Sequence, residues 1–211
     1  MRCPVCKTEH PRRFLKQDAR DYWRCETCAA TFLDPTQLPD KATEYARYCQ
    51  HRNDPQDARY RSFLARLATP LLERLSPGSR GLDYGCGPGP ALAAMLREAG
   101  HTMAIYDPLF FDNPAALIGP YDFITCTEVA EHFHHPAKEF ARLNHLLAAG
   151  GWLGIMTTFL TDDDAFGQWH YRRDLTHVVF YHAMTFEIIA QRFGWYCHIP
   201  CANVALFRKP E

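Results

Sequence analysis

Apolar residues recur in two alternating patterns along the second half of this chain. Short continuous apolar runs predict buried strands at 81–84, 101–106, 121–127 and 152–157. Apolar residues spaced three or four apart predict amphipathic helices at 91–99, 136–147 and 185–193. Strands and helices in alternation predict an α/β fold built on a doubly wound, Rossmann-like sheet.

The residues before this alternation predict two further units. Large apolar side chains recur at i, i+4 and i+8 from 63 to 75, which predicts a helix that starts near Asn53. We therefore divide the chain into a small unit at 1–40, a helical bridge at 41–80 and the α/β domain at 81–211. Tyr45, Tyr48 and Tyr60 of the bridge are open to two interpretations, ordinary core packing or a lid over a ligand pocket.

Composition indicates how large a core the protein can form and in which compartment we expect it. The 211 residues are 47% apolar, enough for one medium domain with a small appendage. Nine cysteines without an apolar leader segment indicate thiols, metal ligands or core residues in a cytoplasmic protein. The longest uncharged run, 143–161, includes Gly150 and Gly151, so we expect no membrane span.

Four of the cysteines form two C-x2-C pairs near the start of the chain. Cys3 and Cys6 are separated by eighteen intervening residues from Cys25 and Cys28, a spacing typical of a structural zinc site. Two residues between thiolates allow both to bind one ion, and two pairs complete a tetrahedron. The segment resembles a zinc ribbon, with strands expected at 22–24 and 30–33.

The glycine loop at 85–89 is the strongest ligand-binding signal. Asp83 ends a strand, Gly85, Gly87 and Gly89 follow at alternate positions, and Pro90 begins a helix. Alternate glycines allow the backbone to pass close to a ligand. A carboxylate directly before the loop suits an ammonium group and would repel a pyrophosphate.

This D-x-G-x-G-x-G pattern resembles motif I of the class I S-adenosylmethionine-dependent methyltransferases. The resemblance implies that Asp83 faces the methionine end of the cofactor and that the loop, with Cys86, lines it. Asp107 follows the next strand, where an acid accepts the ribose hydroxyls in this family, and Tyr106 and Pro108 are expected beside the adenine. The strands at 195–199 and 204–207 resemble the antiparallel pair that closes a methyltransferase sheet.

One departure from the family pattern lies between Asp107 and Tyr121. Only thirteen residues separate them, too few for the usual helix, strand and helix, so we expect the third strand to be missing. The acid that often follows that strand is then missing too, and Phe110 and Phe111 are candidates to stack on the adenine instead.

The strand at 121–127 is followed by Glu128-Val-Ala-Glu-His132, which resembles an E-x-x-E-H motif of small-molecule methyltransferases. Thr127 and Glu128 are therefore expected near the cofactor. His132 is either a general base, a role to which histidine is suited, or a structural histidine.

The segment 168–182 carries the second set of candidate catalytic residues. It has the form Y-x-x-D-x-T-H-V-x-F-Y, which occurs in small bacterial methyltransferases. Tyr171, Asp174 and His177 supply a base and hydrogen-bond donors, and Asp174 is expected to orient the His177 imidazole. The alternative is that Asp174 caps a turn and His177 packs in the core.

These features predict an S-adenosylmethionine-dependent methyltransferase with a structural zinc ribbon, acting at oxygen or nitrogen of a small molecule. One alternative is an RNA methyltransferase that docks through the ribbon. Net charge is +4 over residues 1–75 and −5 over 76–211, which argues against a large nucleic-acid surface on the α/β domain. A second alternative is a non-enzymatic zinc module on a degenerate fold.

Overall fold

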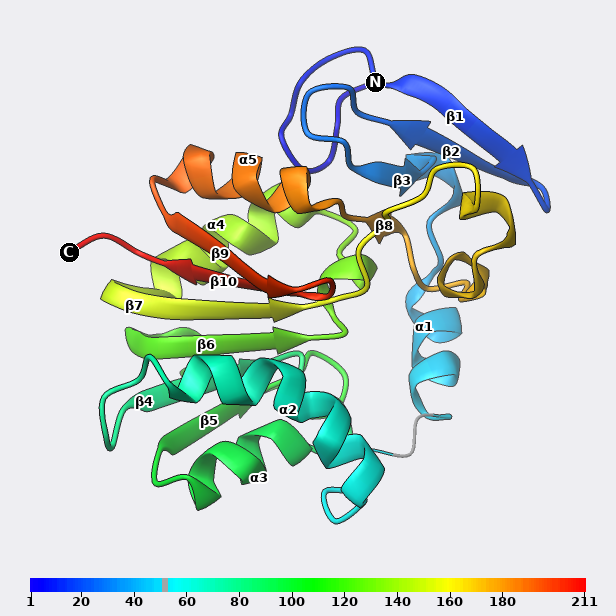
Figure 1. Cartoon of the computed structure of the whole chain (residues 1–211). Helices are drawn as coiled ribbons and strands as arrows, with labels where there is room; N and C mark the ends of the chain where they lie inside the picture. Colours follow the sequence, from blue (N-terminus) through cyan, green and yellow to red (C-terminus); the bar gives the residue numbers. More distant parts are fainter. Residues whose placement is uncertain (51–52) are drawn as a thin grey trace.

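The computed structural model describes residues 1–50 and 53–211. Its centre is a six-stranded sheet in the order β5-β4-β6-β7-β10-β9 (Figure 1). The first four strands in this order are parallel and the last two are antiparallel to their neighbours. Their bounds are β4 Arg80–Tyr84, β5 Thr102–Tyr106, β6 Tyr121–Thr127, β7 Leu147–Met156, β9 Tyr196–Cys201 and β10 Val204–Arg208.

The predicted absence of a third strand is confirmed for the described residues. β5 is an edge strand, and the link from it to β6 contains only one short 3-10 helix, η2 (Pro114–Leu117). The antiparallel closing pair is confirmed as well, with β10 inserted between β7 and β9. The sheet is therefore a doubly wound methyltransferase sheet that lacks one outer strand.

Two pairs of helices cover the two faces of this sheet. α2 (Ala58–Leu72) and α3 (Ala91–Glu98) bury their apolar sides with Met103, Phe123 and Leu206. α4 (Pro136–Leu146) and α5 (Ala183–Phe193) pack on the opposite face with Leu82, Ile124 and other alternate strand residues. Successive strand residues point to opposite faces, which is why the buried runs serve two separate apolar clusters.

The N-terminal unit is a second sheet in the order β1-β2-β3-β8. Three strands come from the ribbon: β1 Arg12–Gln17, β2 Arg20–Arg24 and β3 Thr31–Leu33. The fourth, β8 (Val179–Phe180), comes from the C-terminal part of the chain and pairs antiparallel with β3. Figure 1 shows the ribbon at the top of the molecule, joined to the α/β domain at β8.

Several element boundaries differ from the sequence prediction. α2 begins at Ala58 because the Asp57 side chain accepts from the backbone N–H groups of Arg59 and Tyr60, so the helix starts later than Asn53. The preceding helix, α1 (Lys41–Tyr48), is separate from it. Residues 51 and 52 of the predicted bridge lie outside the described residues. Within the described residues, no helix has the length and apolar character to cross a membrane.

Candidate active site

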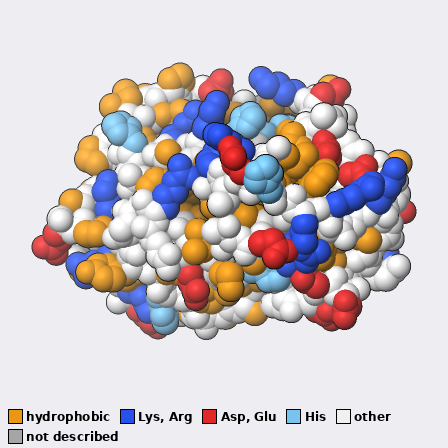
Figure 2. Space-filling view, turned by 90° about the horizontal axis from the view of Figure 1, so that it is seen from above, with side chains coloured by type: hydrophobic (Ala, Val, Ile, Leu, Met, Phe, Trp, Pro, Cys, Tyr) orange, Lys and Arg blue, Asp and Glu red, His pale blue; other side chains and the backbone are white. Residues whose placement is uncertain are grey.

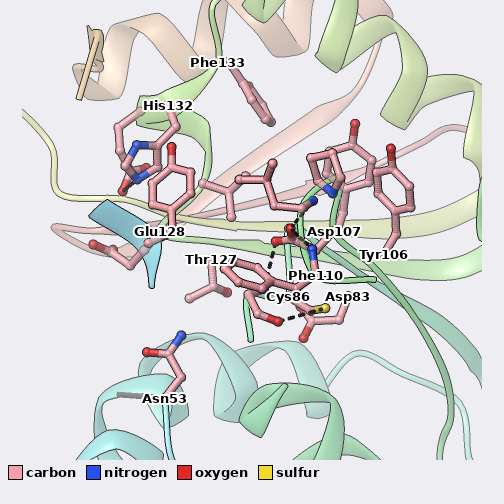
Figure 3. Close-up of a pocket in the computed structure, with 18 of the residues that line it drawn as sticks. Asn53, Asp83, Cys86, Tyr106, Asp107, Phe110, Thr127, Glu128, His132 and Phe133 are labelled. Atoms are coloured by element: carbon pink, nitrogen blue, oxygen red, sulfur yellow. Dashed lines mark hydrogen bonds and ion pairs between the residues drawn. The ribbon is translucent and has the colours of Figure 1, made fainter. Parts of the chain in front are cut away.

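A cavity of about 700 Å³ lies at the carboxyl ends of β4, β5 and β6, and residues of α1 and α2 also line it (Figure 3). This is the place where doubly wound sheets bind ligands, and the volume suits a cofactor-sized molecule. Most of the predicted site residues line it. They are Asp83, Gly85, Cys86, Gly87, Tyr106, Asp107, Pro108, Thr127, Glu128, His132, Asp174 and His177.

The glycine loop is held where no side chain fits. Gly85 has a φ of +77°, and a Cβ there would lie 2.5 Å from Val129. A Cβ on Gly89 would lie 1.8 Å from the backbone oxygen of Asn53. Gly89 does not line the cavity, contrary to the prediction. Its lack of a side chain instead allows the Asn53 segment to pass directly over the loop.

Asp83 is buried at the end of β4, inside the cavity wall. The Thr125 hydroxyl donates to Asp83 Oδ1 at 2.8 Å. Burial raises the pKa of the Asp83 carboxyl from 3.8 to about 6, and the bond from Thr125 opposes part of that rise. A backbone hydrogen bond from Ala93 also favours the ionised form, but the pKa stays raised, so a cationic group bound beside the carboxylate would stabilise its charge.

Asp107 lies at the end of the neighbouring strand β5. Its carboxylate accepts from the backbone N–H of Gly87 at 3.0 Å and from that of Leu109 at 2.9 Å. These bonds hold the acid against the glycine loop at the cavity wall. Tyr106 and Pro108 line the cavity on either side of it, as the family resemblance implies.

The two phenylalanines proposed for adenine stacking have different surroundings. Phe110 lines the cavity and stacks on Tyr45, with ring centroids 6.0 Å apart. Phe111 does not line the cavity, and its backbone pairs with that of Asp107. Phe110 is the better placed of the two. Tyr48 and Tyr60 also line the cavity, which gives the bridge a part in forming the pocket.

The other end of the cavity carries an acidic pair, the partly buried Glu128 and the fully buried Glu131. Glu128 has a φ of +53°, an uncommon conformation for a residue with a side chain. The fully buried Glu131 lies beside it, and the Tyr171 hydroxyl donates to Glu131 Oε1 at 2.6 Å. Burial, and secondarily the charge of Glu131, raises the pKa of Glu128 to about 9. Tyr171 itself lies behind these acids and does not line the cavity.

His132 and His177 lie side by side next to these acids, with ring centroids 4.8 Å apart. Nδ1 of His132 is 2.9 Å from the Thr176 carbonyl oxygen, and Nδ1 of His177 is 2.7 Å from that of Tyr171. A carbonyl only accepts, so each Nδ1 carries a hydrogen and each Nε2 has a free lone pair in the neutral ring. In Figure 3, His132 and Glu128 lie at one end of the pocket and Asp107 and Tyr106 at the other.

Asp174 does not have the predicted contact with His177. Its carboxylate accepts two hydrogen bonds from Arg47, at 2.9 and 2.7 Å, and one from the Thr176 backbone N–H at 3.0 Å. These bonds hold its pKa below the usual value, although burial opposes them. Asp174 therefore ties the loop to α1, and the Tyr171 carbonyl orients His177 instead.

The prediction did not include Glu131 among the site residues, although the E-x-x-E-H motif contains it. It also missed Glu44 of α1, which lines the cavity and lies 2.9 Å from His134. The motif spacing was the signal for Glu131. Nothing in the local sequence pattern points to Glu44, because α1 is placed over the cavity by tertiary packing.

The four predicted metal-ligating cysteines converge in the ribbon. Their sulfur atoms all lie within 4.8 Å of one another, with 3.7 Å between Cys3 and Cys28 and 3.5 Å between Cys6 and Cys25. Sulfurs bound at about 2.3 Å to one tetrahedral ion lie about 3.8 Å apart. The cluster therefore fits a zinc ion.

The fold and the cavity together define the class: a Rossmann-like methyltransferase domain with a cofactor-sized cavity at the carboxyl ends of its parallel strands. A model of the methyltransferase domain family matches residues 51–198. The chain therefore belongs to the methyltransferase domain family.

Individual relatives agree with this class. Ubiquinone biosynthesis O-methyltransferases of Xylella fastidiosa are 30% identical over 107 residues, which cover 38% of this chain and 42% of theirs. The chain thus aligns with less than half the length of these curated relatives.

Solved structures extend the likeness in fold to nearly the whole chain. The 1,6-didemethyltoxoflavin-N1-methyltransferase of Burkholderia thailandensis, with S-adenosylhomocysteine bound, covers 94% of this chain and 99% of its own, with a TM-score of 0.59 and 16% identity. An O-methyltransferase family protein from the same organism covers 83% of this chain and 65% of its own, with a TM-score of 0.54 and 17% identity.

Proposed function

We propose that this protein transfers the methyl group of S-adenosylmethionine to a hydroxyl oxygen of a small molecule. The observation that carries the proposal is one cavity with cofactor-type acids at one end and the Glu128–His132–His177 group at the other. The O-methyltransferase relatives favour oxygen over nitrogen as the acceptor atom. The toxoflavin enzyme, which shares the fold, also has a small-molecule substrate bound.

Each end of the cavity has its own part in the proposed reaction. Asp83 would hold the cofactor's ammonium group and Asp107 its ribose hydroxyls, and the bound cofactor would supply the methyl group. Methyl transfer is an in-line displacement at carbon, and most of its acceleration comes from alignment of the two reactants. The free Nε2 of His132 or His177 is available to the acceptor's hydroxyl group.

The RNA alternative has less support from the ribbon surface. Arg12 is paired with Glu26, Arg13 with Asp21, and Arg24 with Asp163. Figure 2 shows the face of the molecule that contains the ribbon, with acidic and apolar side chains interspersed among the basic ones. Paired cations contribute little to phosphate binding because their charge is already neutralised.

We further propose that Cys3, Cys6, Cys25 and Cys28 bind one structural zinc ion. The support is the fit of their sulfur positions to a tetrahedral site. The buried apolar side chains of the ribbon, among them Val5, Tyr22 and Phe32, belong to a cluster that the ribbon shares with the α/β domain. The ion would therefore stabilise the ribbon's own fold directly.

Calorimetric titration with S-adenosylhomocysteine tests the proposed cofactor site. We expect one site per chain and a loss of at least about tenfold in affinity for Asp107→Ala, since a charge-assisted hydrogen bond is worth about 1.5–3 kcal/mol. Asp112→Ala, an exposed acid on the same loop, is the matched control and keeps the wild-type affinity. A wild-type protein that does not bind the ligand would contradict the proposal and favour a non-enzymatic role.

A further inference from the structure

Three potential metal ligands converge at the end of the cavity opposite Asp107. A carboxylate oxygen of Glu131 and one ring nitrogen each from His132 and His177 all lie within 4.8 Å of one another. Glu131 and His132 belong to the short helix η3 (Ala130–His132), and His177 comes from the loop before β8. All three residues line the cavity.

Both histidines are held in the tautomer that a metal ion requires. Their Nδ1 atoms donate to backbone carbonyls at 2.9 and 2.7 Å, which leaves the Nε2 lone pairs directed elsewhere. Donation from the second ring nitrogen to a carbonyl is the usual support of a metal-bound histidine, since it fixes both the tautomer and the ring orientation.

The acidic pair supplies an independent observation. Glu131 is 0% exposed and its Oε2 has no hydrogen-bond partner, and Oε1 of Glu128 is likewise buried and unpartnered. Among the described residues, no lysine or arginine forms an ion pair with either acid. Buried carboxylate oxygens normally have a donor or a cation as a partner, so these two oxygens point to a ligand.

We propose that Glu131, His132 and His177 bind a divalent first-row transition-metal ion at the acceptor end of the cavity. Two imidazoles and one carboxylate suit ions such as Fe²⁺, Mn²⁺, Co²⁺ and Zn²⁺, and three protein ligands leave coordination positions open. Metal bonds of about 2.0–2.2 Å would draw the three donors together by about 1 Å.

The open positions indicate the class of acceptor, a conclusion that rests on the proposed function. A compound with two adjacent hydroxyl groups can occupy two neighbouring positions and so be fixed in one orientation. The ion lowers the pKa of one bound hydroxyl, whose proton passes to solvent. That oxygen then forms the new O–CH3 bond while the S–CH3 bond breaks, its electron pair remaining on sulfur to give S-adenosylhomocysteine. The acceptor of this enzyme is thus a vicinal dihydroxy compound.

Cobalt titration of the full chain tests the metal site without reference to activity. The ribbon is first filled with one equivalent of Zn²⁺, so that added Co²⁺ reports on a nitrogen and oxygen site through its visible d–d bands. We expect one Co²⁺ per chain, with no thiolate charge-transfer band. Glu131→Gln and His177→Asn should weaken Co²⁺ binding by more than about 100-fold, since even outer-shell partners of a metal ligand are worth about 10- to 100-fold.

Both variants retain the hydrogen-bonding atoms that hold the fold. A glutamine at 131 can still accept from Tyr171, and an asparagine at 177 can still donate to a carbonyl. His145→Ala, an exposed histidine on α4, is the control and should bind Co²⁺ as the wild type does. Unchanged affinity for S-adenosylhomocysteine confirms that each variant is folded.

The acceptor class is tested on the same cobalt-loaded protein. Catechol should shift the d–d bands, whereas phenol, with a single hydroxyl group, should leave them nearly unchanged. Equal responses to the two probes would overturn the inference about the acceptor. A protein that binds S-adenosylhomocysteine but no Co²⁺ would overturn the metal site alone. A protein that binds Co²⁺ but does not bind S-adenosylhomocysteine would instead overturn the proposed function.

Discussion

Replacement of Asp83 by asparagine should stabilise the protein while it weakens cofactor binding. Asp83 is buried at the end of β4, and burial raises its pKa from 3.8 to about 6. The asparagine side chain has nearly the same shape, and its oxygen can still accept from the Thr125 hydroxyl. The substitution therefore removes the buried charge with little change in packing.

The size of the stabilisation follows from the two pKa values. The folded protein binds the Asp83 proton more tightly than the unfolded chain does, so ionisation of Asp83 lowers stability as pH rises from about 4 to 6. A pKa difference of about 2 corresponds to about 3 kcal/mol. Asp83→Asn should recover this amount at pH 7.5, which raises Tm by about 6–12 °C for a chain of this size. Below about pH 4 the gain should vanish.

Cofactor affinity should change in the opposite direction. In the proposed site, the ammonium group of S-adenosylhomocysteine binds the ionised form of Asp83. For a pKa of about 6, the ionised fraction falls from about 90% at pH 7 to about 10% at pH 5. The wild-type dissociation constant should therefore rise about tenfold over this range. The variant should bind more weakly at pH 7 and show no such dependence.

Thermal unfolding and calorimetry, each measured from pH 4 to 8, check both halves of this prediction. Asp112→Asn, at an exposed position, serves as the control and should alter neither stability nor affinity by a measurable amount. If Asp83→Asn lowered Tm at pH 7.5, or if it bound S-adenosylhomocysteine as tightly as the wild type, the assignment of Asp83 would be wrong.

Three other substitutions test separate parts of the structure. Gly89→Ala should weaken cofactor binding by more than about tenfold in calorimetry, because its Cβ would lie 1.8 Å from the Asn53 backbone oxygen; an unchanged affinity would show that this segment adjusts freely. Cys28→Ser should lower the bound zinc, measured by atomic absorption, by one ion per chain, and Tm should fall with it. Tyr171→Phe should destabilise the fold by about 1–3 kcal/mol in denaturant titration, since Glu131 loses its buried hydroxyl donor. Tyr196→Phe, at an exposed tyrosine, is the control, and an equal loss of stability in this variant would argue against that cause.

Local patterns were sufficient to predict the central sheet and most of the residues that line the cavity around Asp83 and Asp107. The D-x-G-x-G-x-G loop and the short link before Tyr121 are continuous in sequence. Their resemblance to, and departure from, the methyltransferase pattern indicated the fold and the missing strand. Helix starts were less certain, because a capping side chain such as Asp57 decides the first turn and several candidates were close together.

The arrangement of His177 and Asp174 at the other end of the cavity depends on contacts that sequence patterns do not encode. β8 has only two residues, too few for a recognisable alternation, and it exists because β3 offers it an edge. The partner of His177 is a backbone carbonyl, which any residue carries, whereas the partner of Asp174 is Arg47, 127 positions away. Contacts of this kind arise from tertiary packing.

The pairing of β3 with β8 has a consequence for how the chain folds as it is synthesised. The ribbon precedes β8 in the chain, so the edge of β3 is covered only after Val179 and Phe180 have been made. Until then, β3 offers unpaired backbone groups to any other extended chain nearby. A fragment that ended before Val179 would leave the edge of β3 unpaired. We expect such a fragment to aggregate during translation even when the four ribbon cysteines have bound their zinc ion.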